Sequence, residues 1–152
     1  MSLLVVGSVA FDALETPSGK VDRTLGGAAT YFAVAASFFT PVNLVGVVGD
    51  DFTPRDASIF RGRRIDTRGL EHAPGKTFFW AGRYSENLND RITLATDLNV
   101  FASFNPRLPD AYRNSRYIFL ANIHPDLQRS VLQQIRVRPK IVALDTMNYW
   151  IE

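Results

Sequence analysis

The chain has 152 residues, of which 46% are hydrophobic and 21% charged, a composition typical of one soluble globular domain. The net charge is only +2, and the basic residues are dispersed apart from Arg61, Arg63 and Arg64. A nucleic-acid partner is therefore not expected. There is no cysteine, which excludes disulfides, thiol catalysis and thiolate metal sites. The two histidines and the carboxylates form no ligand-like cluster, so no metal site is predicted.

The hydrophobic segments do not predict a membrane protein. The most apolar stretch, residues 26–39, is too short and too interrupted by Thr and Ser to cross a bilayer. A strand is expected almost at once after the N-terminus, which leaves no room for a signal peptide. We therefore expect a cytoplasmic protein without a membrane partner.

The first half of the chain alternates strand and helix patterns. Residues 3–7 are a continuous β-branched and Leu run, which predicts a strand buried on both faces. Residues 27–39 are Ala-rich and apolar almost all round, which predicts a buried helix that Pro41 ends. The remaining predicted elements of this half are an exposed turn or short hairpin at 15–23, a strand at 42–48, a short helix at 54–61 and an extended segment at 65–70.

The second half begins with an aromatic hairpin and then returns to the same alternation. Strands at 77–84 and 91–96 are joined by the polar turn 85–90, a pattern that suggests a protruding sheet. A strand at 117–121, a helix at 125–135 and a strand at 141–145 follow. The whole order predicts an α/β fold with a mainly parallel, doubly wound sheet and helices on both faces. Such a sheet rarely ends directly after a buried strand, so we expect the chain to be truncated.

Two nucleotide-binding motifs can be rejected. Gly75-Lys76-Thr77 matches the end of the phosphate-binding loop G-x-x-x-x-G-K-[ST], but position 70, where the first glycine belongs, is Leu70. A strand pattern follows it instead of the helix that holds phosphates. The segment after the first strand, residues 7–12, lacks the second and third glycines of the dinucleotide-binding motif.

Asp12 and the Gly26-Gly27 pair are the candidate ligand contacts. Asp12 is expected just beyond the carboxyl end of the first strand, where open α/β sheets bind ligands. Its carboxylate can accept hydrogen bonds from two neighbouring hydroxyls, although it could equally cap a local backbone amide. The glycines would let a ligand approach the backbone and the free amides of the following helix, or they could form a plain tight turn.

These features occur in a characteristic order. Asp12 after the first strand, Gly26-Gly27 at a helix start, and the strand of residues 45–48 with Gly49-Asp50-Asp51 together resemble the N-terminal half of the ribokinase/PfkB family of carbohydrate kinases. The resemblance runs from Leu3 to about Asp145. It implies a ribokinase-like fold in which strands at about 13–25 and 76–97 form a small β lid.

The resemblance also implies a substrate site for a sugar or nucleoside. Asp12, Gly26 and Gly27 would contact the substrate, and Phe79 and Arg83 are the lid side chains expected to face it. By strand alternation Trp80 and Tyr84 would then point the other way. Many members carry Asn where this chain has Tyr31, which could stack on a ring or fill the core.

Polar residues that follow later strands complete the expected crevice. Asn122 is a further substrate-binding candidate, and Asp145 and Asn148 are expected at the crevice edge near the nucleotide. His124 precedes Pro125, so initiation of a helix explains it better than a functional role does.

The activity that the resemblance implies is ATP-dependent phosphorylation of a sugar or nucleoside hydroxyl, with ATP and Mg²⁺ as cofactors. The family places its base and anion hole in a late G-A-G-D motif, which this chain lacks. The catalytic base is thus expected beyond Glu152, and the chain alone is expected to be inactive. Two alternatives are a non-catalytic sugar-binding module and an interaction module that forms a homodimer through its lid. The sequence does not choose among sugars and nucleosides.

Overall fold

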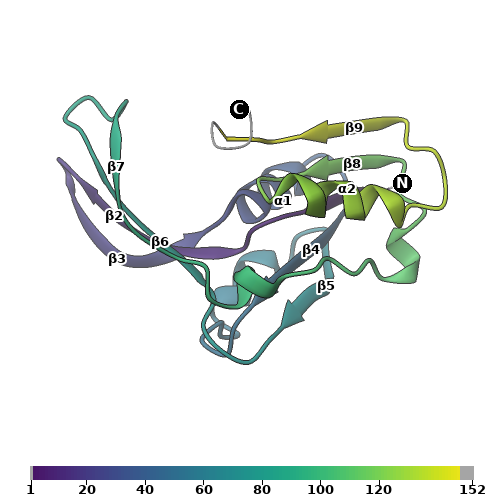
Figure 1. Cartoon of the computed structure of the whole chain (residues 1–152), viewed down its shortest axis with the longest axis horizontal. Coiled ribbons are helices and arrows are strands. Elements are labelled where there is room, and N and C mark those ends of the chain that lie inside the picture. The colour runs from purple at the N-terminus through teal and green to yellow at the C-terminus, as the bar shows by residue number, and fades with distance from the viewer. Residues whose placement is uncertain (1, 148–152) are drawn as a thin grey trace.

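A five-stranded parallel sheet forms the centre of the computed structural model, which describes residues 2–147 (Figure 1). Its strands lie in the order β5-β4-β1-β8-β9, and every neighbouring pair is parallel. The five strands are β1 (Leu3–Val6), β4 (Val42–Val48), β5 (Ile65–His72), β8 (Tyr117–Leu120) and β9 (Ile141–Leu144). The predicted mainly parallel α/β sheet is confirmed.

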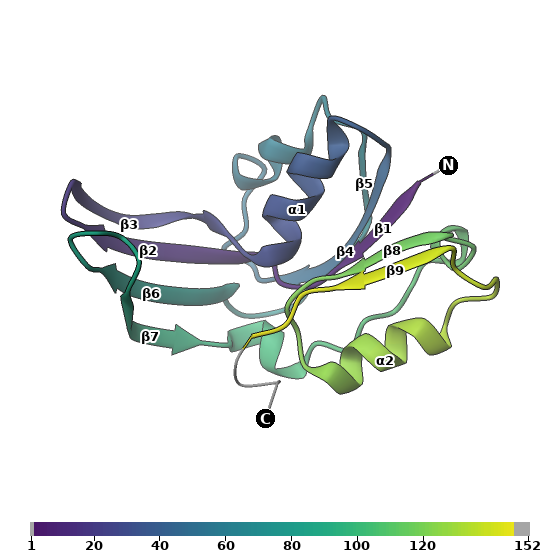
Figure 2. The same ribbon diagram turned by 90° about the horizontal axis from the view of Figure 1, so that it is seen from above.

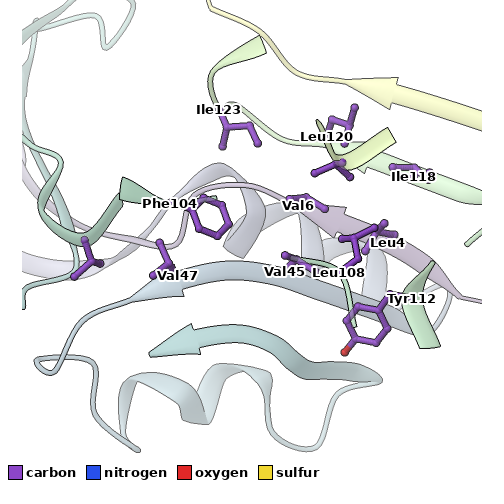
Figure 3. Close-up of a cluster of buried hydrophobic side chains, with 12 residues drawn as sticks. Leu4, Val6, Val45, Val47, Phe104, Leu108, Tyr112, Ile118, Leu120 and Ile123 are labelled. Carbon is purple, nitrogen blue, oxygen red and sulfur yellow. The ribbon is translucent and has the colours of Figure 1, made fainter. Parts of the chain in front are cut away.

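Helices cover both faces of this sheet, as Figure 2 shows. Helix α1 (Ala28–Ser37) packs on one face and α2 (Pro125–Gln133) on the other. Leu4 and Val6 join the core cluster that contains Val131 of α2, whereas Val5 joins the cluster that contains Ala29 of α1. Strand β1 is therefore buried on both faces, as its apolar run predicts. Figure 3 shows the first cluster, with the ring of Tyr112 at its edge.

A second sheet protrudes from the first and has the strand order β3-β2-β6-β7. It consists of β2 (Ala10–Thr16), β3 (Gly19–Gly26), β6 (Phe78–Tyr84) and β7 (Arg91–Asp97), and we call it the lid sheet. Strands β2 and β6 pair in parallel, and the two outer pairs are antiparallel. The exposed turn expected at 15–23 is the tip of a longer hairpin, because pairing continues down to Ala10 and Gly26.

Three short 3₁₀ helices, η1 (Asp56–Phe60), η2 (Asn99–Ser103) and η3 (Asp110–Tyr112), complete the described part of the chain. The short helix expected at 54–61 is thus η1. No helix in the described residues has the length and apolar character needed to cross a membrane.

The direction of winding reverses beside the central strand. From β1 the chain moves outward to β4 and β5, then returns to β8 on the other side of β1. Gly7 follows β1 and Ala121 follows β8, and a Cβ at Gly7 would lie only 3.3 Å from the Ala121 Cα and overlap its side chain. Open α/β sheets bind ligands at the carboxyl ends of strands that flank such a reversal. The lid sheet begins at this edge.

Candidate functional site

Asp12 lies within lid strand β2, whereas the sequence placed it just beyond the first strand and expected the lid strand to begin at about residue 13. Its half-buried carboxylate lies over the backbone of Gly26, where an added Cβ would be 2.6 Å from Oδ1 and would overlap the rest of the group. Among residues 2–147 this carboxylate accepts no hydrogen bond and forms no ion pair, so it does not cap a backbone amide. Burial raises its pKa above the ordinary value. It is a partly desolvated acceptor without a protein donor, a typical property of a ligand site.

Gly26 and Gly27 are both required by the local geometry, for different reasons. A side chain at Gly26 would displace the Asp12 carboxylate. Gly27 has a φ of 94°, and a Cβ there would be 2.9 Å from the Ala10 nitrogen and would overlap the Ser8 carbonyl. The pair therefore closes the turn from β3 into α1 and leaves room for Asp12.

The first amides of α1 are not free, contrary to expectation. The Ser8 hydroxyl accepts the Ala28 amide at 3.1 Å, and the Ser8 carbonyl accepts the Ala29 amide at 3.1 Å. Ser8 thus ties the helix N-terminus to the segment after β1. The sequence did not indicate this role of Ser8, because an N-cap residue normally precedes its helix directly. The whole β2–β3 hairpin separates Ser8 from α1 in the sequence.

Tyr31 does not fill the core. Its side chain is 60% exposed, and its hydroxyl donates to the Leu25 carbonyl at 3.2 Å. It lies in the first turns of α1, beside the base of lid strand β3. Of the two expectations for Tyr31, filling the core is wrong, and stacking on a ring stays a prediction.

The lid residues divide between two faces. Asp12 pairs with Trp80 across β2 and β6, whereas Phe11 pairs with Phe79. Because paired residues point to the same side of a sheet and successive residues alternate, Trp80 shares the face of Asp12 and Phe79 lies opposite. The alternation expected from the sequence is present, but it places Trp80, and not Phe79, beside Asp12.

The opposite lid face carries the two predicted lid residues, Phe79 and Arg83. Phe79 lines a cavity of about 370 Å³ together with Phe11 and Arg23, and it packs against the core cluster on the α1 side. Arg83 donates to the Glu15 carboxylate at 2.6 Å. The structure therefore does not bring Phe79 and Arg83 together with Asp12.

Asn122 and Asp145 follow the carboxyl ends of β8 and β9, and one buried side chain holds these two ends together. The amide of Gln128 donates to the carbonyls of Leu120, Ala121 and Asp145 at 3.3, 3.2 and 3.1 Å. Asn122 Nδ2 donates to Met147 Sδ at 3.4 Å. Asn148 lies outside the described residues. Gln128 could not be singled out from sequence, since nothing in its helical pattern marks it as buried.

His124 and the acidic turn have structural roles. His124 is the N-cap of α2, and its Nδ1 accepts the Asp126 amide at 3.2 Å, which confirms helix initiation. Asp51 Oδ1 accepts both the amide and the hydroxyl of Thr77, at 2.8 and 2.7 Å. Thr77 then leads into strand β6 instead of a helix, so the rejection of a phosphate-binding loop is confirmed. In the described part of the chain no three His, Asp or Glu side chains form a metal-binding group.

Comparison with solved structures decides the fold. The nucleoside kinase of Methanocaldococcus jannaschii, an archaeal member of the ribokinase family, superposes on 95% of this chain with a TM-score of 0.70 at 16% identity, and 52% of it is covered. Fructokinase of Halothermothrix orenii also gives a TM-score of 0.70, at 18% identity, with 95% of this chain and 57% of that chain covered. The chain has the ribokinase-like fold.

A curated relative gives the same indication from sequence. The cytidine kinase of Thermococcus kodakarensis is 27% identical over 147 residues, which are 95% of this chain and 51% of that enzyme. No protein-family model matches the sequence. The chain with its ribokinase-like fold thus spans about half the length of the curated relative and of the solved kinases that it resembles.

Proposed function

We propose that this chain supplies the substrate-binding half of an ATP-dependent kinase of the ribokinase/PfkB type, which phosphorylates a hydroxyl of a sugar or nucleoside. The observation that carries the proposal is the Asp12 carboxylate, which is half-buried at the base of the lid sheet and has no donor among residues 2–147. A pair of ligand hydroxyls supplies the donors that this group lacks. The similarity to nucleoside and sugar kinases supports the same assignment.

The described residues contribute binding and orientation, and not the chemical step. Asp12 holds the hydroxyl-bearing ligand, Gly26 leaves room for its carboxylate, and Gly27 closes the turn into α1. Asn122 and Asp145 lie at the strand ends that border the same edge of the sheet. In a kinase of this type ATP provides the phosphoryl group and Mg²⁺ neutralises its charge. In the described part of the chain no three His, Asp or Glu side chains are grouped so that they could hold Mg²⁺.

A thermal-shift panel tests this assignment. Ligand that binds only the native state raises the melting temperature in proportion to the logarithm of its concentration. Ribose, fructose and nucleosides are each titrated against the 152-residue chain and its Asp12→Asn variant. A concentration-dependent rise in the unaltered chain that the variant lacks supports the proposal, and equal rises in both would refute it. With ATP and Mg²⁺ added, the 152-residue chain should give no turnover above background.

The exposed lid favours one alternative, an interaction module. Val21, Ile92 and Leu94 on the outer lid strands are 44%, 65% and 46% exposed, and β3 and β7 are free edges of the lid sheet. Such edges can pair with a second copy. Sedimentation that stays monomeric over a wide concentration range would contradict a lid-mediated homodimer.

A further inference from the structure

Trp80 is placed beside Asp12 by the pairing of two lid strands. Asp12 of β2 and Trp80 of β6 are direct partners on one face of the lid sheet, and adjacent strands are about 5 Å apart. Among residues 2–147 the Trp80 indole stacks on no other ring, and its N–H makes no hydrogen bond. A carboxylate and a large aromatic group, neither of them with a polar or stacking partner in the described chain, thus extend from neighbouring strands on the same face of the lid sheet.

Gly82 determines how the indole lies. A Cβ at Gly82 would be 2.6 Å from Cζ2 and 2.8 Å from Cζ3 of Trp80 and would overlap Cη2. Close approach to three successive atoms of the six-membered ring means that the ring turns a face, and not its edge, toward Gly82. The indole therefore lies against the sheet over a glycine, as the Asp12 carboxylate lies over Gly26. Its opposite face is directed away from the lid backbone.

We propose that Trp80 is a stacking platform for a planar aromatic base, and that the substrate of this site is a nucleoside. This inference rests on the proposed function and narrows it. In a nucleoside a vicinal diol and a flat ring are joined through one sugar, so the diol can donate to Asp12 while the base covers the neighbouring indole. A free sugar satisfies Asp12 but leaves the indole face uncovered. Base–indole stacking favours the nucleoside about tenfold or more over the sugar alone.

The test compares a nucleoside with the sugar that it contains. Cytidine and ribose are titrated calorimetrically against the 152-residue chain and against Trp80→Ala, Trp80→Phe and Asp12→Asn. We expect cytidine to bind the unaltered chain at least about tenfold more tightly than ribose. Trp80→Ala should abolish this advantage without changing ribose affinity, and Trp80→Phe should keep part of it because a smaller ring remains.

Fluorescence reports the same contact directly. The chain has two tryptophans, so a Trp150→Phe background leaves Trp80 as the single one. Stacking of cytidine should quench its emission, and ribose should not. If Trp80→Ala weakens the binding of both ligands equally, or if both ligands bind the unaltered chain with equal affinity, the proposed role of Trp80 is overturned. The proposed function is not affected by either result. Unchanged affinities in Asp12→Asn, or no binding of either ligand, overturn the proposed function itself.

Discussion

At the scale of single residues, two side chains of the candidate site lie over glycines. The Asp12 carboxylate occupies the space where Gly26 would carry a Cβ, and the Trp80 indole occupies the corresponding space at Gly82. The order of motifs in the sequence made Asp12 and the glycine pair the candidate ligand contacts, and that role stays a prediction. Their contact could not be predicted, because it depends on the pairing of β2 with β3, and a strand pairing is a long-range property.

Asp12 should reduce the stability of the fold at neutral pH. Burial raises its pKa in the native state, so this state binds more protons than the unfolded chain between the ordinary and the raised value. The free energy of unfolding therefore falls as the pH rises through that window. Asp12→Asn removes the charge and should raise the free energy of unfolding at pH 7. Urea denaturation of the unaltered chain and of the variant measures this change in the free energy of unfolding.

Asp66 is the matched control, because its pKa is shifted in the opposite direction to that of Asp12. Hydrogen bonds from Arg68 lower the pKa of Asp66 to about 2, so its ionised form stabilises the native state above the ordinary pKa and loses this effect as the pH falls toward 2. Asp66→Asn should thus lower the free energy of unfolding at pH 7. If Asp12→Asn destabilised the chain as Asp66→Asn does, Asp12 would be a structural residue.

The two glycines should respond differently to alanine. Gly27→Ala forces a side chain into a conformation with φ of 94° and into the Ser8 carbonyl, and it should cost about 2 kcal/mol or more. Gly26→Ala meets the movable Asp12 carboxylate and should weaken ligand binding more than it weakens the fold. Denaturation and calorimetry on both variants separate the two effects. A loss of stability in Gly26→Ala as large as in Gly27→Ala would contradict this division.

At the scale of elements, most strands and both helices could be predicted from periodicity. The apolar run of β1 and the Ala-rich pattern of α1 were sufficient. The start of β2 was missed, because Val9 to Phe11 continue the apolar pattern of β1 past Gly7, and the two strands cannot be separated by composition. For the same reason the sequence placed Asp12 just beyond the first strand and not within the second.

Buried Gln128 should be essential for the join between β8 and β9. Its amide satisfies three backbone carbonyls at the ends of these strands. Gln128→Leu removes this donor from the Ala121 and Asp145 carbonyls, whereas the Leu120 carbonyl still accepts the Asp145 amide at 2.8 Å. The free energy of unfolding should therefore fall by about 1–3 kcal/mol. Gln133→Leu on the exposed side of α2 is the control and should change it little. Similar effects of both substitutions in urea denaturation would argue against this role.

At the scale of the whole molecule, the lid sheet and the carboxyl ends of the central strands meet at the reversal of winding beside β1. The alternation of strands and helices predicted the α/β class, and the order of motifs predicted the ribokinase-like fold. Which lid face carries the site could not be predicted, since alternation fixes relative but not absolute orientation. The pairing of Asp12 with Trp80 shows that these two residues share one face of the lid sheet.

The most direct test is a calorimetric titration of the 152-residue chain and its Asp12→Asn variant with a ligand that carries a vicinal diol, at pH 7 and again near pH 4. We predict saturable binding to the unaltered chain at pH 7, weakened at least about tenfold by the substitution, because the neutral amide replaces an ionised acceptor. Binding should also weaken at the lower pH, as protons neutralise a carboxyl whose pKa burial raises. Equal affinity of the two proteins at pH 7 would contradict the assignment of Asp12 as the ligand-binding carboxylate.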